Sequence, residues 1–163
     1  MTDPETKRGR MGTQHTKQLA IVSSLYRRLP MEWWLSAVKK GKLQTLPVSR
    51  FKPNSNDADG LSVSQASIST IEIASTTAKG KRDCLAAFPA VAAVSRGLTV
   101  EPKPTDLDPG HAIISEMNYG ALQDPETEKV VEEHAFALAQ ASTVAWPTEN
   151  SPPPAGLARP TPF

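Results

Sequence analysis

Proline and glycine interrupt this chain from end to end and restrict it to short structural elements. There are 15 prolines and 9 glycines among 163 residues. Proline ends helices and is confined to the edges of sheets, so long uninterrupted elements are disfavoured. Apolar residues make up only 39% of the chain and aromatic residues 6%. We therefore expect one small domain with a lean core and long loops.

Three segments carry helix signals. Residues 18–29 place several apolar side chains at helical spacing, which favours a helix, although residues 24–29 alone could form a strand. Residues 31–40 lie between a proline and a glycine, the combination that starts and stops a helix. Residues 125–141 follow Asp124 as N-cap and begin with Pro125, which predicts a long helix.

Extended structure is predicted for most of the region between these helices. The five expected strands are residues 61–64, 69–75, 84–88, 98–102 and 111–115. A short helix over 89–97 would make the third and fourth of these a strand–helix–strand unit, the one candidate for a parallel pairing. Residues 43–53 are expected to be an extended loop or edge strand. The fold class is therefore α+β: a small, mostly antiparallel sheet with N-terminal helices and one C-terminal helix.

The two ends of the chain lack a core-forming pattern. Residues 1–17 are polar and basic, and residues 147–163 are rich in proline. We expect both to be disordered tails flanking a single α+β domain over residues 18–146.

Charge and composition disfavour several classes of partner. Formal net charge is +1, which provides no global field for nucleic acid or an anionic membrane. No apolar run approaches the ~20 residues of a membrane span, and no secretory signal pattern is evident, so the cytoplasm is the expected location. Cys84 is the only cysteine, and the histidines lack ligand spacing, so we expect no disulfide, metal or cofactor.

The stretch DADGLSVS, residues 57–64, has three interpretations. Asp57, Asp59 and Gly60 resemble half of a calcium loop, but Ser, Gln and Ala follow where further ligands are needed. A turn that leads into a strand is the favoured interpretation. In the third, the hydroxyls of Ser62 and Ser64 contact a ligand.

His111 follows a turn and begins an expected strand. A carboxylate from Asp106, Asp108 or Glu116 could orient one of its ring nitrogens while the other acts as a base. The simpler alternative is a ring nitrogen bonded to a turn carbonyl.

Cations flank the expected extended segments near the first helices: Arg27, Arg28, Arg50 and Lys52. If they converge on the Ser62 strand they form an anion-binding surface, and otherwise they are scattered solvated charges. The nucleotide-binding, zinc-protease and serine-hydrolase motifs are absent from the sequence.

Two resemblances add to these observations. Residues 51–63, 97–104 and 108–114 match the pattern F-x-P-x-x-x-D-x-x-G-L-S-V, G-L-x-V-x-P-x-P and D-P-G-H-A-x-I. This pattern resembles a group of short bacterial proteins of unknown function, which implies a bacterial cytosolic protein and a compact α+β domain.

The second resemblance is to ADP-ribosyltransferase-like toxins. LYRR at 25–28 followed by LSVS at 61–64 is similar to their order of an arginine strand and a serine strand. The likeness implies that an Arg or His holds a nicotinamide dinucleotide and that a glutamate serves transfer. The matching Glu-x-Glu is missing, which leaves Glu116, Glu132 and Glu133 as candidates.

These observations lead to two functional hypotheses. The first is a small binding module that acts through protein contacts, with a partner encoded nearby. The second is a transferase or hydrolase-like effector that uses His111, Ser62 and Arg28. Whether the protein is an enzyme stays open. In both, the turns at 57–60 and 108–111 are expected to meet at a common rim of the sheet, and the expected binding residues are Arg27, Arg50, Asp59, Ser64, Asp108 and His111.

Overall fold

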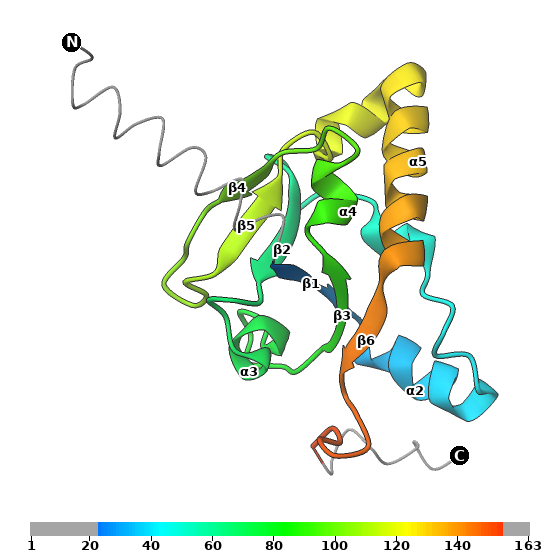
Figure 1. Ribbon diagram of the computed structural model, residues 1–163, viewed down its shortest axis with the longest axis vertical. Helices are drawn as coiled ribbons and strands as arrows, with labels where there is room; N and C mark the ends of the chain where they lie inside the picture. The colour runs from blue at the N-terminus through cyan, green and yellow to red at the C-terminus, as the bar shows by residue number, and fades with distance from the viewer. Residues whose placement is uncertain (1–22, 155–163) are drawn as a thin grey trace.

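The computed structural model describes residues 23–154, which form one sheet with helices on both of its faces (Figure 1). The strands are β1 (Ser24–Leu29), β2 (Leu61–Gln65), β3 (Cys84–Pro89), β4 (Val100–Pro102), β5 (His111–Ile114) and β6 (Thr143–Trp146). The helices are α2 (Met31–Lys40), α3 (Ile71–Ser75), α4 (Val91–Val94) and α5 (Pro125–Ala141), with short 3₁₀ helices η1 (Val48–Phe51) and η2 (Tyr119–Gln123).

The six strands form a single sheet in the order β4-β5-β2-β1-β3-β6. Every pairing among them is antiparallel, which confirms an α+β fold built on a small antiparallel sheet. The predicted parallel pairing across α4 is wrong. β4 instead forms a hairpin with β5, so β5, β2 and β1 all lie between it and β3.

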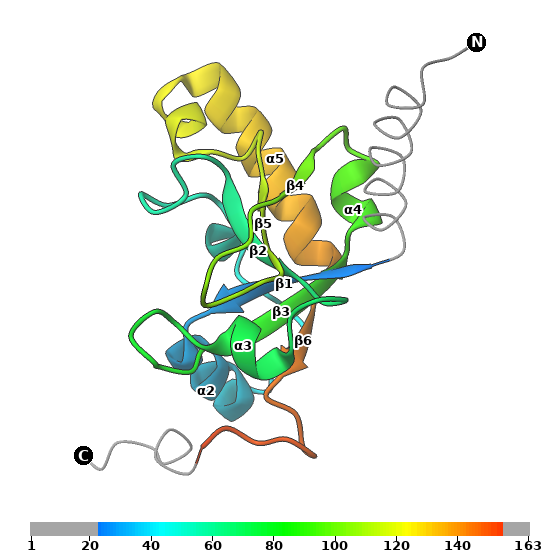
Figure 2. The ribbon, with the colours of Figure 1, turned by 90° about the vertical axis from the view of Figure 1, so that its left-hand side faces the viewer.

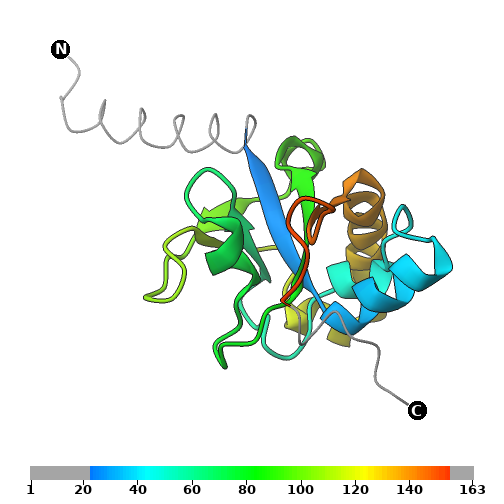
Figure 3. The same ribbon diagram turned by 90° about the horizontal axis from the view of Figure 1, so that it is seen from below.

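One face of the sheet carries the main core. Alternate residues of the strands, among them Leu25, Val63 and Phe88, are buried with Leu138 of α5. Phe51 of η1 meets Phe88 edge to face, with ring centroids 6.2 Å apart. Figure 3 shows α5 and α2 on this side of β1 and α3 on the other.

The opposite face is only partly covered. Leu85 packs there with Met31, Ala74 and Trp146 in a smaller apolar cluster. Arg82 lies over the Trp146 ring at 4.1 Å and donates to Ser75 Oγ, which holds the segment around α3 against the sheet. Toward β2 and β5 this face becomes polar.

Two segments differ from their predicted secondary structure. Residues 24–29 form a strand rather than the end of a helix, while residues 18–22 of that prediction lie outside the described residues. A spacing of four puts Leu25 and Leu29 on one face in either structure, and pairing with β3 along all six residues favours the strand. Residues 71–75 form helix α3 rather than a strand, because the Thr70 side chain caps the N–H of Ile73.

Most of the other predicted helices and strands lie close to those of the structure. The helices over 31–40 and 125–141 are confirmed, and Asp124 accepts from the N–H of Glu126 as expected of an N-cap. The segment 43–53 is a loop that contains η1, so the loop alternative is confirmed and the edge strand is not formed; β6 had no predicted counterpart. Beyond β6, Trp146 Nε1 donates to Ser151 Oγ at 3.1 Å, and Pro147 and Pro153 are buried. No helix among residues 23–154 is both long and apolar enough to cross a membrane.

A buried ion pair joins β1 to the turn before β2. Backbone pairing of these strands covers only two residue pairs, and the strands run in different directions (Figure 2). Where the pairing stops, Arg27 donates to the carbonyls of Ser62 at 2.8 Å and Arg50 at 2.9 Å, and its Nη2 lies 3.5 Å from Asp57 Oδ2. Asp57 in turn accepts from the N–H groups of Asn54 and Ser62. Burial lowers the pKa of Arg27, an effect that the Asp57 charge opposes.

We predict that Arg27→Met lowers the free energy of unfolding by about 3–5 kcal/mol, because it leaves the Asp57 carboxylate buried without its counter-ion. Arg28→Met, one residue along the same strand, removes an exposed guanidinium and should cost no more than about 1 kcal/mol. Urea denaturation of both variants tests this. Equal losses for the two would contradict the role given to Arg27.

Candidate functional site

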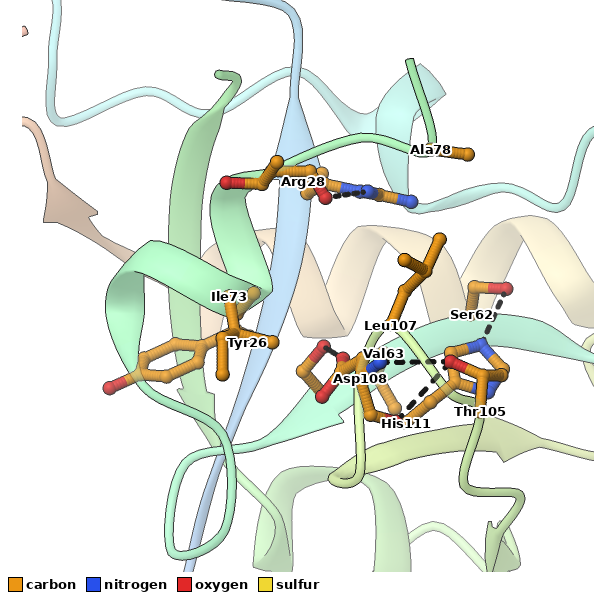
Figure 4. Close-up of a pocket in the computed structure, with 13 residues that line it drawn as sticks. Tyr26, Arg28, Ser62, Val63, Ile73, Ala78, Thr105, Leu107, Asp108 and His111 are labelled. Atoms are coloured by element: carbon orange, nitrogen blue, oxygen red, sulfur yellow. Dashed lines mark hydrogen bonds between the residues drawn. The ribbon is translucent and has the colours of Figure 1, made fainter. Parts of the chain in front are cut away.

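A cleft with both polar and apolar walls opens on the less covered face, at the point where β1 and β2 separate (Figure 4). Its volume is about 210 Å³. Strand β1 contributes Tyr26 and Arg28, β2 contributes Ser62 and Ser64, and β5 contributes His111. The strand alternation brings these side chains to one face, because the apolar residues between them point into the main core. The other walls are α3 with its following loop and the loop 103–110.

His111 and Ser62 form a hydrogen-bonded pair in this cleft. His111 Nδ1 lies 2.8 Å from the carbonyl oxygen of Lys103, and Nε2 lies 3.3 Å from Ser62 Oγ. A carbonyl can only accept, so Nδ1 carries a proton, and in the neutral imidazole Nε2 is the acceptor that faces Ser62. The structure thus agrees with the simpler interpretation, in which a ring nitrogen bonds a loop carbonyl, and none of the three candidate carboxylates orients the ring. Nε2 faces Ser62 in the cleft, where it could also act as a base.

Arg28 supplies the positive charge of the cleft. Its Nη1 donates to the carbonyl of Thr76 at 2.9 Å, which fixes the direction of an otherwise exposed side chain. Among the described residues its remaining N–H groups have no hydrogen-bond partner, so the planar fork is available to a phosphate or carboxylate.

Asp108 anchors the loop that carries His111. Its carboxylate accepts from the hydroxyls of Ser64, at 2.5 Å, and Ser69, and from the N–H of Gly110 at 2.9 Å. A Cβ on Gly110 would fall 2.0 Å from Ser69 Oγ, so only glycine allows the loop to sit this close. With its oxygens engaged, Asp108 positions the loop and does not contact the imidazole.

The prediction that the turns at 57–60 and 108–111 meet at a common rim of the sheet is wrong. Antiparallel register pairs Leu61 with Ile114 and Ser64 with His111, so the turn at 57–60 and the turn before His111 lie at opposite ends of the same strand pair. Ser62 still meets His111 because they are diagonal neighbours on one face. Asp59 is exposed in its turn and lines neither the cleft nor the second cavity described below.

The candidate arginines and glutamates fall in different places. Arg27 lies on the opposite face in its ion pair, and Arg50 lines the second cavity. None of the three candidate glutamates lines the cleft. Glu116 accepts from both N and Oγ1 of Thr99, and these bonds lower its pKa although burial alone would raise it. Glu132 pairs with Lys52, and Glu133 is exposed on α5.

Thiolate and metal chemistry find no support in residues 23–154. Cys84 is fully buried in the core, and burial, with a smaller effect of Asp83, raises the pKa of its thiol to about 12. No group of three or more potential metal-ligating side chains comes together in this part of the chain.

Several cleft residues escaped the sequence analysis. Tyr26 precedes Arg28 by two positions and would have been grouped with it had residues 24–29 been interpreted as a strand. Thr76 and Thr105 come from loops, where periodicity gives no signal. Ser69 does not line the cleft but bonds Asp108; it was expected in a strand, and this bond depends on a loop-to-loop contact between distant segments.

Comparisons of this chain with protein-family models, with curated proteins and with solved structures gave no match. The bacterial and cytoplasmic assignments therefore stay predictions.

We predict that Asp108→Ala lowers the free energy of unfolding by about 1–3 kcal/mol, because two buried hydroxyls lose a charged acceptor. Amide exchange at Gly110 should accelerate, since its N–H loses the same partner. Asp106→Ala, an exposed carboxylate in the same loop, should stay within about 0.5 kcal/mol of the parent. Unchanged Gly110 exchange in the Asp108 variant would show that the loop does not depend on this carboxylate.

Proposed function

We propose that the cleft binds a nicotinamide dinucleotide and that the protein transfers its ADP-ribosyl group to an acceptor. The observation that carries the proposal is the convergence of Arg28 from β1, Ser62 from β2 and His111 from β5 on one cleft. The resemblance to ADP-ribosyltransferase-like toxins called for an arginine strand and a serine strand, and here these strands are neighbours in the sheet.

Each group has a distinct part in this proposal. Arg28, oriented by the Thr76 carbonyl, holds the pyrophosphate through its free N–H groups. Ile73 and Leu107 line the cleft with apolar surface that the nicotinamide ring would contact, and Tyr26 bounds this side of it. The hydroxyl of Ser62 hydrogen-bonds to the ribose or to the imidazole.

The transfer step requires a base, and His111 provides one. The bond between ribose C1′ and the nicotinamide nitrogen breaks, and nicotinamide leaves with the electron pair as a neutral molecule. An acceptor hydroxyl or water attacks C1′, and His111 Nε2 takes its proton. No glutamate of the described chain lines the cleft, so the imidazole does the work that the resemblance assigns to a glutamate.

The alternative is a module that acts through protein contacts. The observation in its favour is the outer face of α5, where Phe136 is 52% exposed and Val130 49% exposed. That hypothesis assigns no ligand to the cleft, so dinucleotide binding separates the two.

We predict that NAD⁺ raises the melting temperature in a saturable manner. Arg28→Gln should weaken binding about ten-fold, the equivalent of ~1.4 kcal/mol. His111→Gln should leave binding nearly intact but slow nicotinamide release about 10²- to 10⁴-fold, because it removes the base.

His134→Gln is the matched control, since this histidine lies on α5 and bonds Arg96 outside the cleft. It should change neither binding nor nicotinamide release. Absence of a saturable shift with NAD⁺, or equal rates for the His111 and His134 variants, would refute the proposal.

A further inference from the structure

A second cavity lies next to the cleft, and its lining is strongly cationic. It has a volume of about 280 Å³ and is bounded by Arg27, Arg28, Arg50 and Lys52, with Asp83 as its only carboxylate. Arg28 lines this cavity and the cleft alike, so the two hollows adjoin at its side chain.

The positive charges here are incompletely compensated. Arg27 is paired with Asp57, and Lys52 with Glu132 on the surface. Among residues 23–154, the guanidinium groups of Arg28 and Arg50 have no ion-pair partner. Both arginines therefore keep an uncompensated charge beside a cavity whose only lining carboxylate is Asp83.

The backbone holds these cations in place. The carbonyl of Arg50 accepts from Arg27 Nε, which ties the end of η1 to β1 and brings the Arg50 side chain to the cavity. Arg28 is fixed from the other side by Thr76. The hydroxyls of Ser49 and Thr77 also line the cavity and are suitable donors to an anion.

We infer that this second cavity binds a phosphate monoester group, held by Arg50, Lys52 and the outer side of Arg28. Arginine forks and a lysine ammonium are the side chains that suit a doubly charged phosphate, and a neutral or cationic ligand would leave the repulsion among them in place. Phosphate binding in the second cavity does not require the proposed function. Where the cleft binds a dinucleotide as proposed, Arg28 is the boundary shared by two anion subsites.

The phosphate has two possible sources with the same chemistry. It belongs either to a phosphorylated dinucleotide, as the 2′-phosphate that NADP⁺ carries beyond the pyrophosphate, or to a phosphorylated acceptor brought beside the cleft. Competition between ligands distinguishes them.

Ribose 5-phosphate titrated calorimetrically into the full chain is the test, with ribose as the matched compound that lacks the phosphate. We expect ribose 5-phosphate to bind and ribose not to bind. The affinity for ribose 5-phosphate should fall as the salt concentration rises. Arg50→Gln and Lys52→Gln should each weaken binding about ten-fold. The fold should survive in the Arg50 variant, because its backbone carbonyl, not its side chain, contacts Arg27.

Arg96→Gln, an exposed arginine outside both cavities, is the control and should bind like the parent. Ser62→Ala and His111→Gln should also retain ribose 5-phosphate binding. The phosphate site is therefore tested independently of the proposed transfer activity. Displacement by NADP⁺ and not by NAD⁺ would assign the phosphate to the dinucleotide, and binding of ribose 5-phosphate in the presence of saturating NADP⁺ would assign it to an acceptor. Equal binding of ribose, no binding at all, or unchanged affinity in the Arg50 and Lys52 variants would overturn the inference.

Discussion

The buried ion pair between Arg27 and Asp57 determines where this sheet opens. Strands β1 and β2 share backbone hydrogen bonds over a short stretch, and beyond it the Arg27 guanidinium occupies the position of the missing strand partner. A guanidinium placed there needs a counter-ion, and Asp57 provides it while also organising the turn before β2. The separation of the two strands creates the cleft, so a structural charge pair on one face shapes the candidate site on the other.

The two faces of the sheet have different roles. The core face gains its stability from apolar packing against α5 and η1. The opposite face carries hydroxyls, an imidazole and an arginine, each fixed by a backbone carbonyl or a neighbouring side chain. Asp108 supports this arrangement from behind by bonding Ser64 and Ser69. Groups held in this way need little reorganisation when a ligand arrives, which is a general requirement of binding and catalytic sites.

The errors in the sequence predictions have identifiable physical causes. Leu25 and Leu29 fit a helix and a strand equally well, and only the long pairing with β3 distinguishes them. Ile71 and Ile73 have strand propensity, but the Thr70 cap and burial of Ala74 stabilise a helical turn. The expected rim failed because antiparallel register sends the two turns to opposite ends of β2 and β5. Candidate residues chosen by type, such as Ser62, His111 and Arg28, nevertheless line one cleft. Each lies in a strand, and the alternation of side chains along the strands places all three on the same face of the sheet.

Local sequence patterns were enough to predict the helices over 31–40 and 125–141 and four of the five expected strands, and they showed that familiar catalytic motifs are absent. These follow from local physics: capping, proline and glycine geometry, and alternation act over a few residues and need no knowledge of distant partners. Tertiary structure alone decided the strand order, the partner of Arg27 and the roles of the two aspartates. Asp57 and Asp108 both sit in turns that the sequence predicts equally well. One neutralises a buried arginine and the other bonds two serines, because these partners come from strands and loops far away in the chain.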